Sequence, residues 1–119
     1  MFDHVLLNVS NRKESMKFYT PALQILGIKA LYDQNAYTAY GPDSFHFWLR
    51  ESDKKDVTRK AHLAFSASSR KQVDEFYQAA LAAGGESNGA PGLREYGPTY
   101  YAAYVLDFEG NNIEVVCNK

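Results

Sequence analysis

Two stretches of this sequence match each other and decide the fold. Residues 4–27 read HVLLNVSNRKESMKFYTPALQILG, and residues 62–85 read HLAFSASSRKQVDEFYQAALAAGG. Aligned without a gap at an offset of 58, they agree at nine of 24 positions, beginning with His4 and His62. Two unrelated stretches of average composition agree at about one or two positions. The match indicates an internal duplication, two copies of one half-domain.

The size of the chain requires the two copies to share one core. With 119 residues the protein is as long as one ordinary domain, so we expect a single domain, residues 1–119, made of half-modules at about 1–52 and 60–119. The net charge of −1 gives no field that would attract nucleic acid. No stretch approaches the roughly twenty apolar residues of a membrane span, and the N-terminus has no secretion-signal pattern. A cytoplasmic protein without nucleic-acid or membrane partners is therefore expected.

Each copy is predicted to fold as βαβββ. Asn11 with Glu14, and Ser69 with Gln72, have the spacing of a capping box at a helix start, and glycines follow both helices at Gly27 and at 84–85. Strands are expected at 2–9, 28–33, 36–41 and 45–51, and again at 61–67, 86–90, 100–107 and 111–117. Residues 87–92, SNGAPG, are typical of a loop. The fold class is α+β, two tandem modules with helices on the outer face of a curved mixed sheet.

Strand alternation separates an apolar face from a polar one, because successive side chains point to opposite sides. The apolar set comprises Val5, Leu7, Val9, Phe45, Phe47, Leu49, Leu63, Phe65, Ala67, Ile113, Val115 and Cys117. The helices should cover this face. The opposite set holds all three histidines and a carboxylate: His4, His46, His62 and Glu114, with Trp48 among them. A sheet covered on one side only would curve, so that the polar face becomes a cup and a candidate site.

Two histidines and a glutamate are a ligand set that suits a divalent Zn, Ni, Co, Mn or Fe ion with open positions for a substrate. His4, His62 and Glu114 are the candidates here. The alternative is that each histidine is an ordinary, partly buried residue with a hydrogen-bond partner.

The sequence resembles the vicinal oxygen chelate superfamily of glyoxalases, bleomycin-resistance proteins and extradiol dioxygenases, over essentially its whole length. The resemblance rests on Asp3-His4-Val5, Phe18-Tyr19, Ala61-His62-Leu63-Ala64-Phe65 and the closing segment 107–114, DFEGNNIE; segment 88–94, NGAPGLR, is similar to that of a small glyoxalase-like subgroup. It implies a half-barrel whose metal ligands come from the first and last strand of each module. His4, His62 and Glu114 match three ligand positions, Glu114 also being the candidate catalytic residue.

The fourth ligand position is where the sequence departs from the resemblance. Trp48 stands where glyoxalase I has a glutamate, and tryptophan is not a metal ligand. His46 lies two residues earlier on the same face, about 6.6 Å along a strand, and is the alternative fourth ligand if the strand is shifted. Otherwise His46 lines the cup or hydrogen-bonds a ligand.

The resemblance implies a metal-dependent enzyme of lyase, isomerase or dioxygenase type that acts on a small molecule with two neighbouring oxygens. The competing class is a metal-free binding protein of the bleomycin-resistance type, in which aromatic side chains hold a flat ligand. Candidate pocket residues are Trp48, Arg94, Tyr96, Tyr101 and Tyr104, with Arg94 able to bind a carboxylate or phosphate. The family also implies a homodimer, with modules pairing either within one chain or between two.

Overall fold

The computed structural model describes all residues from Met1 to Lys119 and contains two modules of the same topology. In the first, strand β1 (Val5–Val9) leads into helix α1 (Arg12–Gln24), followed by β2 (Lys29–Gln34), β3 (Tyr37–Gly41) and β4 (Phe47–Glu51). A short 3₁₀ helix, η1 (Lys54–Asp56), connects to the second module. There β5 (His62–Ser66) and α2 (Arg70–Ala82) precede β6 (Glu86–Leu93), β7 (Tyr101–Leu106) and β8 (Asn112–Cys117). The predicted βαβββ repeat is confirmed.

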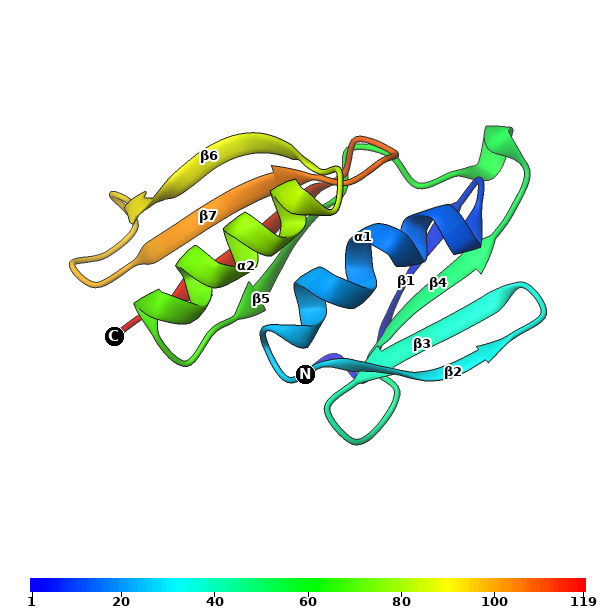
Figure 1. The fold of residues 1–119 in the computed structure, drawn as a ribbon, viewed down its shortest axis with the longest axis horizontal. Helices are drawn as coiled ribbons and strands as arrows, with labels where there is room; N and C mark the ends of the chain where they lie inside the picture. The colour runs from blue at the N-terminus through cyan, green and yellow to red at the C-terminus, as the bar shows by residue number, and fades with distance from the viewer.

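The eight strands form two separate four-stranded sheets. Their strand orders, β1-β4-β3-β2 and β5-β8-β7-β6, are the same when the second module is counted from β5. In each sheet the first and last strands of the module pair in parallel, and the other pairs are antiparallel. The sheets lie end to end along the long axis, and both helices cover the same side (Figure 1). Neither helix is long and apolar enough to cross a membrane.

Both helices begin as the sequence predicts. The side chain of Asn11 accepts a hydrogen bond from the backbone N–H of Glu14, and the Ser69 hydroxyl accepts one from that of Gln72. These caps satisfy backbone donors that have no partner within the helix. The same physical start signal therefore operates at equivalent points of the two copies.

The helix ends show a difference that the alignment conceals. The sequence repeat pairs Gly27 with Gly85, but the left-handed backbone conformation that favours glycine occurs at Gly27 (φ 76°) and Gly84 (φ 102°). Gly85 is needed for another reason. A Cβ atom there would lie 2.5 Å from the Phe18 ring, so only glycine lets α1 approach the start of β6.

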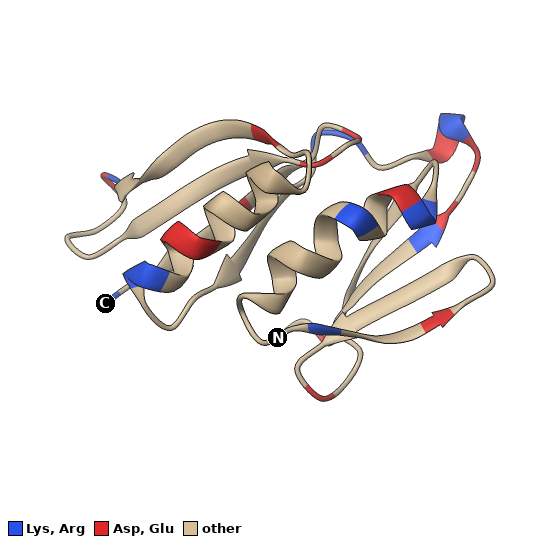
Figure 2. Cartoon of the chain, in the orientation of Figure 1, with Lys and Arg blue, Asp and Glu red and all other residues tan.

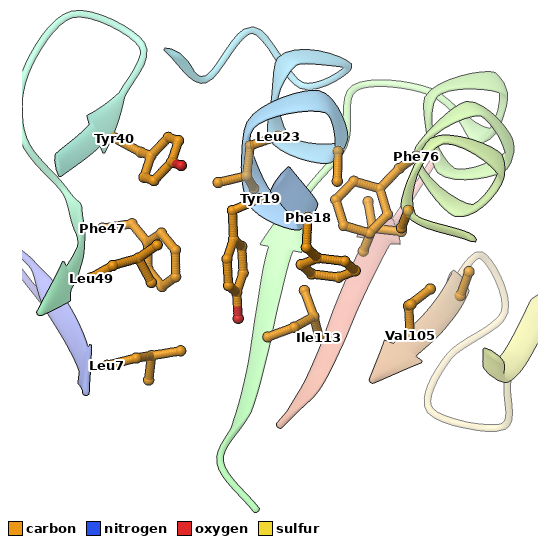
Figure 3. Close-up of a cluster of buried hydrophobic side chains, with 14 of the residues drawn as sticks. Leu7, Phe18, Tyr19, Leu23, Tyr40, Phe47, Leu49, Phe76, Val105 and Ile113 are labelled. Carbon is orange, nitrogen blue, oxygen red and sulfur yellow. The ribbon is translucent and has the colours of Figure 1, made fainter. Parts of the chain in front are cut away.

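One hydrophobic core runs through both modules. Phe18 and Tyr19, neighbours on α1, lie between the side chains of the two sheets (Figure 3). The Phe18 ring meets that of Phe108, with centroids 5.8 Å apart, and the Tyr19 ring meets that of Phe47 at 5.1 Å. Because α1 supplies side chains to both halves, neither module has a core of its own.

Two sequence expectations need correction. Residues 87–92 belong to β6, whose pairing with β7 shifts register on both sides of Gly89; this edge strand tolerates the glycines and Pro91 that suggested a loop. Phe45 does not share the apolar face. It precedes β4, is 43% exposed, and its ring lies 5.5 Å from that of Trp48 on the polar side, because alternation begins only at Phe47.

A buried carboxylate joins the modules. Asp107, in the turn between β7 and β8, accepts a hydrogen bond from the Tyr19 hydroxyl of α1 and one from the backbone N–H of Asn111, at 2.8 Å. The side chain of Asn111, fully buried, in turn binds the N–H of Ala61 and the carbonyl of Thr58, both in the connection between modules. The closing DFEGNN segment therefore fixes the first helix and the connection against the second module.

Replacing Tyr19 with phenylalanine should lower the free energy of unfolding by about 1–3 kcal/mol, because Asp107 loses a buried hydrogen-bond donor. Burial and the Asp107 charge raise the pKa of Tyr19 well above 10. Above pH 10 the unfolded chain releases this proton and the folded chain keeps it, so wild-type stability falls as the pH rises. Urea unfolding at pH 8 and 10.5 should show a shallower fall in the variant.

Tyr77, the repeat equivalent of Tyr19, is the matched control. Its hydroxyl donates to Ser87 in a solvent-exposed hydrogen bond, so Tyr77→Phe should cost less than about 1 kcal/mol. Equal losses in the two variants would contradict a special role for the buried pair.

Candidate functional site

The polar face of the second module carries a pocket of about 480 Å³. It is lined by His62, Asn88, Tyr96, Tyr100, Tyr104, Asn112 and Glu114. All four strands of the sheet contribute, together with the connection between β6 and β7. Alternation explains why: Glu114 and Tyr104 are direct partners in the β7–β8 register and so point to the same side. The pocket thus lies on the sheet face opposite α2.

Glu114 is the centre of this pocket. Only 3% of the residue is exposed, and both carboxylate oxygens have partners. One lies 2.7 Å from Nε2 of His62, and the other accepts a hydrogen bond from the hydroxyl of Tyr100. A buried carboxylate needs such partners, because an unpaired charge in the interior is strongly unfavourable.

The negative charge of Glu114 affects the tyrosines around it. The hydrogen bond to Glu114, with burial and the same charge, raises the pKa of Tyr100 to about 12. Burial, and then the Glu114 charge, raise the pKa of Tyr104. Both tyrosines are therefore neutral hydroxyl groups at physiological pH.

The first module has a second pocket, of about 500 Å³, in the equivalent place. Its lining comprises Asp3, His4, Leu6, Tyr37, Ser44, Phe45, His46 and Trp48. Nδ1 of His4 lies 2.7 Å from a carboxylate oxygen of Asp3, which leaves Nε2 as the nitrogen open to a ligand. That contact, followed by the His4 charge, lowers the pKa of Asp3.

The strand register decides which residue of the first module is equivalent to Glu114. In β5–β8, Glu114 is the partner of Ala64, two residues after His62; in β1–β4, Trp48 is the partner of Leu6, two residues after His4. Trp48 therefore takes the structural position of Glu114. His46 precedes β4, and its two nitrogens lie 2.9 Å from the carbonyl oxygen of Asp3 and 2.9 Å from the Ser44 hydroxyl.

Trp48 lies among other aromatic rings. The centroids of Phe45, Tyr32 and Tyr37 lie 5.5, 5.9 and 6.0 Å from that of Trp48. Phe45 and Tyr37 are exposed. The first pocket is thus an aromatic surface with histidines at one end, whereas the second holds hydrogen-bonding groups around a carboxylate.

The structure divides the candidate residues between two pockets, and His46 and His62 also line a third cavity, which has residues of both modules in its wall. His62, Glu114, Tyr96 and Tyr104 line one pocket, and His4, His46 and Trp48 line the other. No three His, Cys, Asp or Glu side chains in the chain are close enough to hold a metal ion together. Two imidazoles and a carboxylate remain the candidate ligand set, but one chain places only His62 and Glu114 side by side.

Tyr101 was expected to line the pocket, but it does not. It is offset by an odd number of residues from Tyr104 on β7 and so points to the helix side, where its hydroxyl donates to Asp74 of α2 and Arg70 lies over its ring. Tyr100 directly precedes β7, and its even offset from Tyr104 within the expected strand 100–107 indicates the same face; its hydrogen bond to Glu114 is what the sequence did not show. Asn112 follows from alternation, two residues before Glu114.

The sequence profile of the Glyoxalase/Bleomycin resistance protein/Dioxygenase superfamily matches residues 1–115. The chain belongs to this superfamily. A glyoxalase/bleomycin resistance protein from Albidiferax ferrireducens T118 is 29% identical, with a TM-score of 0.85 over 100% of this chain and 99% of the other. A putative glyoxalase from Bacillus halodurans is 25% identical, with a TM-score of 0.76 over 98% and 95% of the two chains.

A more distant structure shares the fold. The fosfomycin resistance protein FosX from Listeria monocytogenes is 20% identical, with a TM-score of 0.73 over 100% of this chain and 93% of the other. A search of curated protein sequences gives no significant match. The comparisons therefore establish the superfamily and the fold of this chain. The superfamily includes both enzymes and resistance proteins.

Replacing Tyr100 with phenylalanine should destabilise the protein by about 1 kcal/mol, since one oxygen of the buried Glu114 carboxylate loses its donor. Thermal unfolding at neutral pH measures the effect. Tyr96→Phe is the control: Tyr96 lines the same pocket and its ring lies 5.2 Å from that of Tyr100, but it is 76% exposed, so its loss should stay below about 0.5 kcal/mol. A Tyr100 variant as stable as the Tyr96 variant would contradict the role assigned to this hydrogen bond.

Proposed function

We propose that this protein is a divalent-metal-dependent enzyme that acts on a small molecule with two neighbouring oxygens. The observation that carries the proposal is the pairing of His62 with the buried carboxylate of Glu114 at the floor of an open pocket. A half-exposed imidazole and a buried carboxylate 2.7 Å apart form two adjacent positions of a metal site with nitrogen and oxygen ligands.

The third ligand in this proposal is His4 of a second copy of the chain. His4 has a free Nε2 and an Asp3 carboxylate on its other nitrogen, the arrangement that commonly orients a metal-binding histidine. Because the two pockets of one chain are separate, a homodimer in which the first module of one protomer faces the second module of its partner completes the set. His46 takes a supporting role, bound to the Asp3 carbonyl, rather than a fourth ligand position.

In such a site the cation and the surrounding side chains have different roles. A bound divalent cation supplies Lewis-acid stabilisation of negative charge on the substrate oxygens. Glu114, as the carboxylate of the site, is also the group placed to hold a proton taken from the substrate. The neutral hydroxyl of Tyr104 orients the substrate, while the hydroxyl proton of Tyr100 stays in the hydrogen bond to Glu114. The activity class is that of a lyase, isomerase or dioxygenase.

Metal content tests the proposal directly. Protein purified without chelators or a metal-binding tag should contain a divalent metal, or should take up Ni, Zn, Mn or Fe(II) after dialysis, and His4→Ala, His62→Ala and Glu114→Ala should each lose it. The control is Tyr96→Phe, which removes no ligand from the same pocket. Wild-type protein that remains metal-poor after each metal is added would overturn the metalloenzyme.

Mixing variants tests whether the site is shared between protomers. His4→Ala and Glu114→Ala each remove a ligand from every site of their own homodimer. In a mixed dimer both changes fall in one site and the other site is intact, so subunit exchange should restore part of the metal content. If the ligands come from the same chain, exchange restores nothing.

A second candidate function is metal-free binding of a flat ligand, and the aromatic rings around Trp48 favour it. Trp48 is the single tryptophan of the chain, so its fluorescence reports on this pocket alone. If this function is correct, an aromatic ligand should quench Trp48 equally in wild-type protein and in Glu114→Ala, with chelator present. Quenching that requires both Glu114 and added metal would instead support the enzyme.

A further inference from the structure

The segment from Asn88 to Arg94 forms a feature that the proposed metal site does not use. It lies in the irregular part of β6 and just after it, where the pairing with β7 shifts register twice. Gly89 and Gly92 leave this part of the strand without side chains next to Tyr104. The side chain of Arg94 folds back into the space that these glycines leave.

The contacts of Arg94 show that the guanidinium group is held in place. A Cβ atom on Gly92 would lie 3.0 Å from Nη1, and one on Gly89 would lie 3.3 Å from Nη2 and 2.8 Å from the Tyr104 ring. Nη2 donates to the carbonyl of Ala90 at 2.6 Å, and the guanidinium carbon lies 5.3 Å from the centroid of the Tyr104 ring. These contacts order a side chain that would otherwise lose considerable entropy on binding a ligand.

This position places a cation beside the pocket that contains Glu114. Register pairs Tyr104 with Glu114 on one side and with Gly89 on the other, so the three residues form one row across the sheet. Tyr104 lines the pocket, and its ring lies 6.2 Å from that of His62. The Glu114 carboxylate and the Arg94 guanidinium therefore lie on either side of the same tyrosine. Figure 2 shows a basic and an acidic segment side by side where β6 ends, and Arg94 and Glu95 directly follow this strand.

The chemistry of the guanidinium group indicates a ligand of opposite charge. A guanidinium has five N–H donors, and two of those of Arg94 are used on backbone carbonyls, those of Ala90 and, at 3.5 Å, Leu93. The remaining donors can bind two oxygens of one group in parallel, as arginine does with carboxylates and phosphates. With a net charge of −1, the chain itself offers an anion no long-range attraction, so a local cation has to supply the binding energy.

We propose that Arg94 is a specificity-determining residue that binds an oxyanion of the substrate at the β6 side of the second-module pocket. The substrate class is then an organic carboxylate or phosphate, whose other oxygens reach the His62–Glu114 pair. This assignment of substrate class rests on the proposed function, but the anion site itself lies within one chain and needs neither metal nor partner. Gly89 and Gly92 serve the site by leaving room for the guanidinium.

The test measures binding of three small aromatic probes to the metal-free protein by calorimetry, with a chelator present. Benzoate and phenyl phosphate carry an oxyanion, and benzamide is the neutral analogue of benzoate. Wild-type protein should bind the anionic probes more tightly, and Arg94→Met should weaken them about tenfold or more while leaving benzamide unchanged, as expected for loss of a charge-assisted hydrogen bond. The better anionic probe identifies the group.

One further variant tests whether the position of the Arg94 guanidinium matters, and a second serves as a control. Gly92→Ala keeps Arg94 but adds a Cβ atom 3.0 Å from Nη1, so the guanidinium has to shift by a few tenths of an ångström; Gly92 does not have the left-handed backbone conformation, so the strand should accept alanine. It should weaken anion binding in the same direction as Arg94→Met. Arg59→Met, which removes an exposed arginine bound to the Lys54 carbonyl, is the control and should leave binding unchanged. Unfolding curves verify that each variant is folded.

The outcomes distinguish this proposal from the metal proposal. Wild-type protein that binds neither anionic probe, or an Arg94→Met variant that binds them unchanged or loses benzamide equally, overturns the anion site. Arg94-dependent anion binding in a protein that never takes up metal supports the anion site and overturns the metalloenzyme. The metal content of Arg94→Met should equal that of wild type.

Discussion

The buried carboxylate of Asp107 holds the two halves of this protein in a fixed relation. It binds the hydroxyl of Tyr19 from α1 and backbone N–H groups of its own turn, while Asn111, from the same turn, binds the connection between the modules. An ionised group in the interior is stable only when its hydrogen-bonding capacity is satisfied. Moving the helix, the connection or the turn by itself would therefore break a buried hydrogen bond. It determines where each polar sheet face, and each pocket, lies.

The two copies have the same topology but carry different side chains at equivalent positions of their polar faces. Equivalent register positions carry Trp48 in the first module and Glu114 in the second. Around Trp48 the neighbours are aromatic rings, and around Glu114 they are tyrosine hydroxyls and an imidazole. A ligand that contacted both faces would meet an apolar wall on one side and charged, hydrogen-bonding groups on the other. The asymmetry fits an organic molecule that has an apolar part and an oxygen-rich part.

The second module also holds two opposite charges near one another, on either side of Tyr104. Glu114 is buried between its partners, and Arg94 is seated over two glycines on the far side of Tyr104. Because both are held by contacts within the sheet, little ordering is needed when a ligand arrives. The irregular pairing of β6, which weakens the ladder locally, is what makes room for the arginine.

The sequence by itself determined the duplication, the βαβββ order, the helix caps at Asn11 and Ser69, and the separation of an apolar from a polar strand face. These features depend on local periodicity and on side chains that hydrogen-bond within one turn, so they can be predicted from a single sequence. Alternation also placed His62 and Glu114 on one face. It failed for Phe45, which precedes β4, since alternation holds only inside a strand. For Tyr101, inside β7, alternation with Tyr104 holds, and it was the expected place in the pocket that was wrong.

Only the tertiary structure decided that His4 and His62 lie in separate pockets of one chain, that Trp48 rather than His46 takes the place of Glu114, and that Tyr100 binds Glu114 while Arg94 lies against Tyr104. Each depends on the packing of distant segments. How far apart two sheets lie is set by the shared core and the Asp107 hydrogen bonds, and a side chain outside a strand has no periodicity that reveals its direction. For that physical reason the sequence indicated which residues are candidates for the site, and the fold decided which of them lie together.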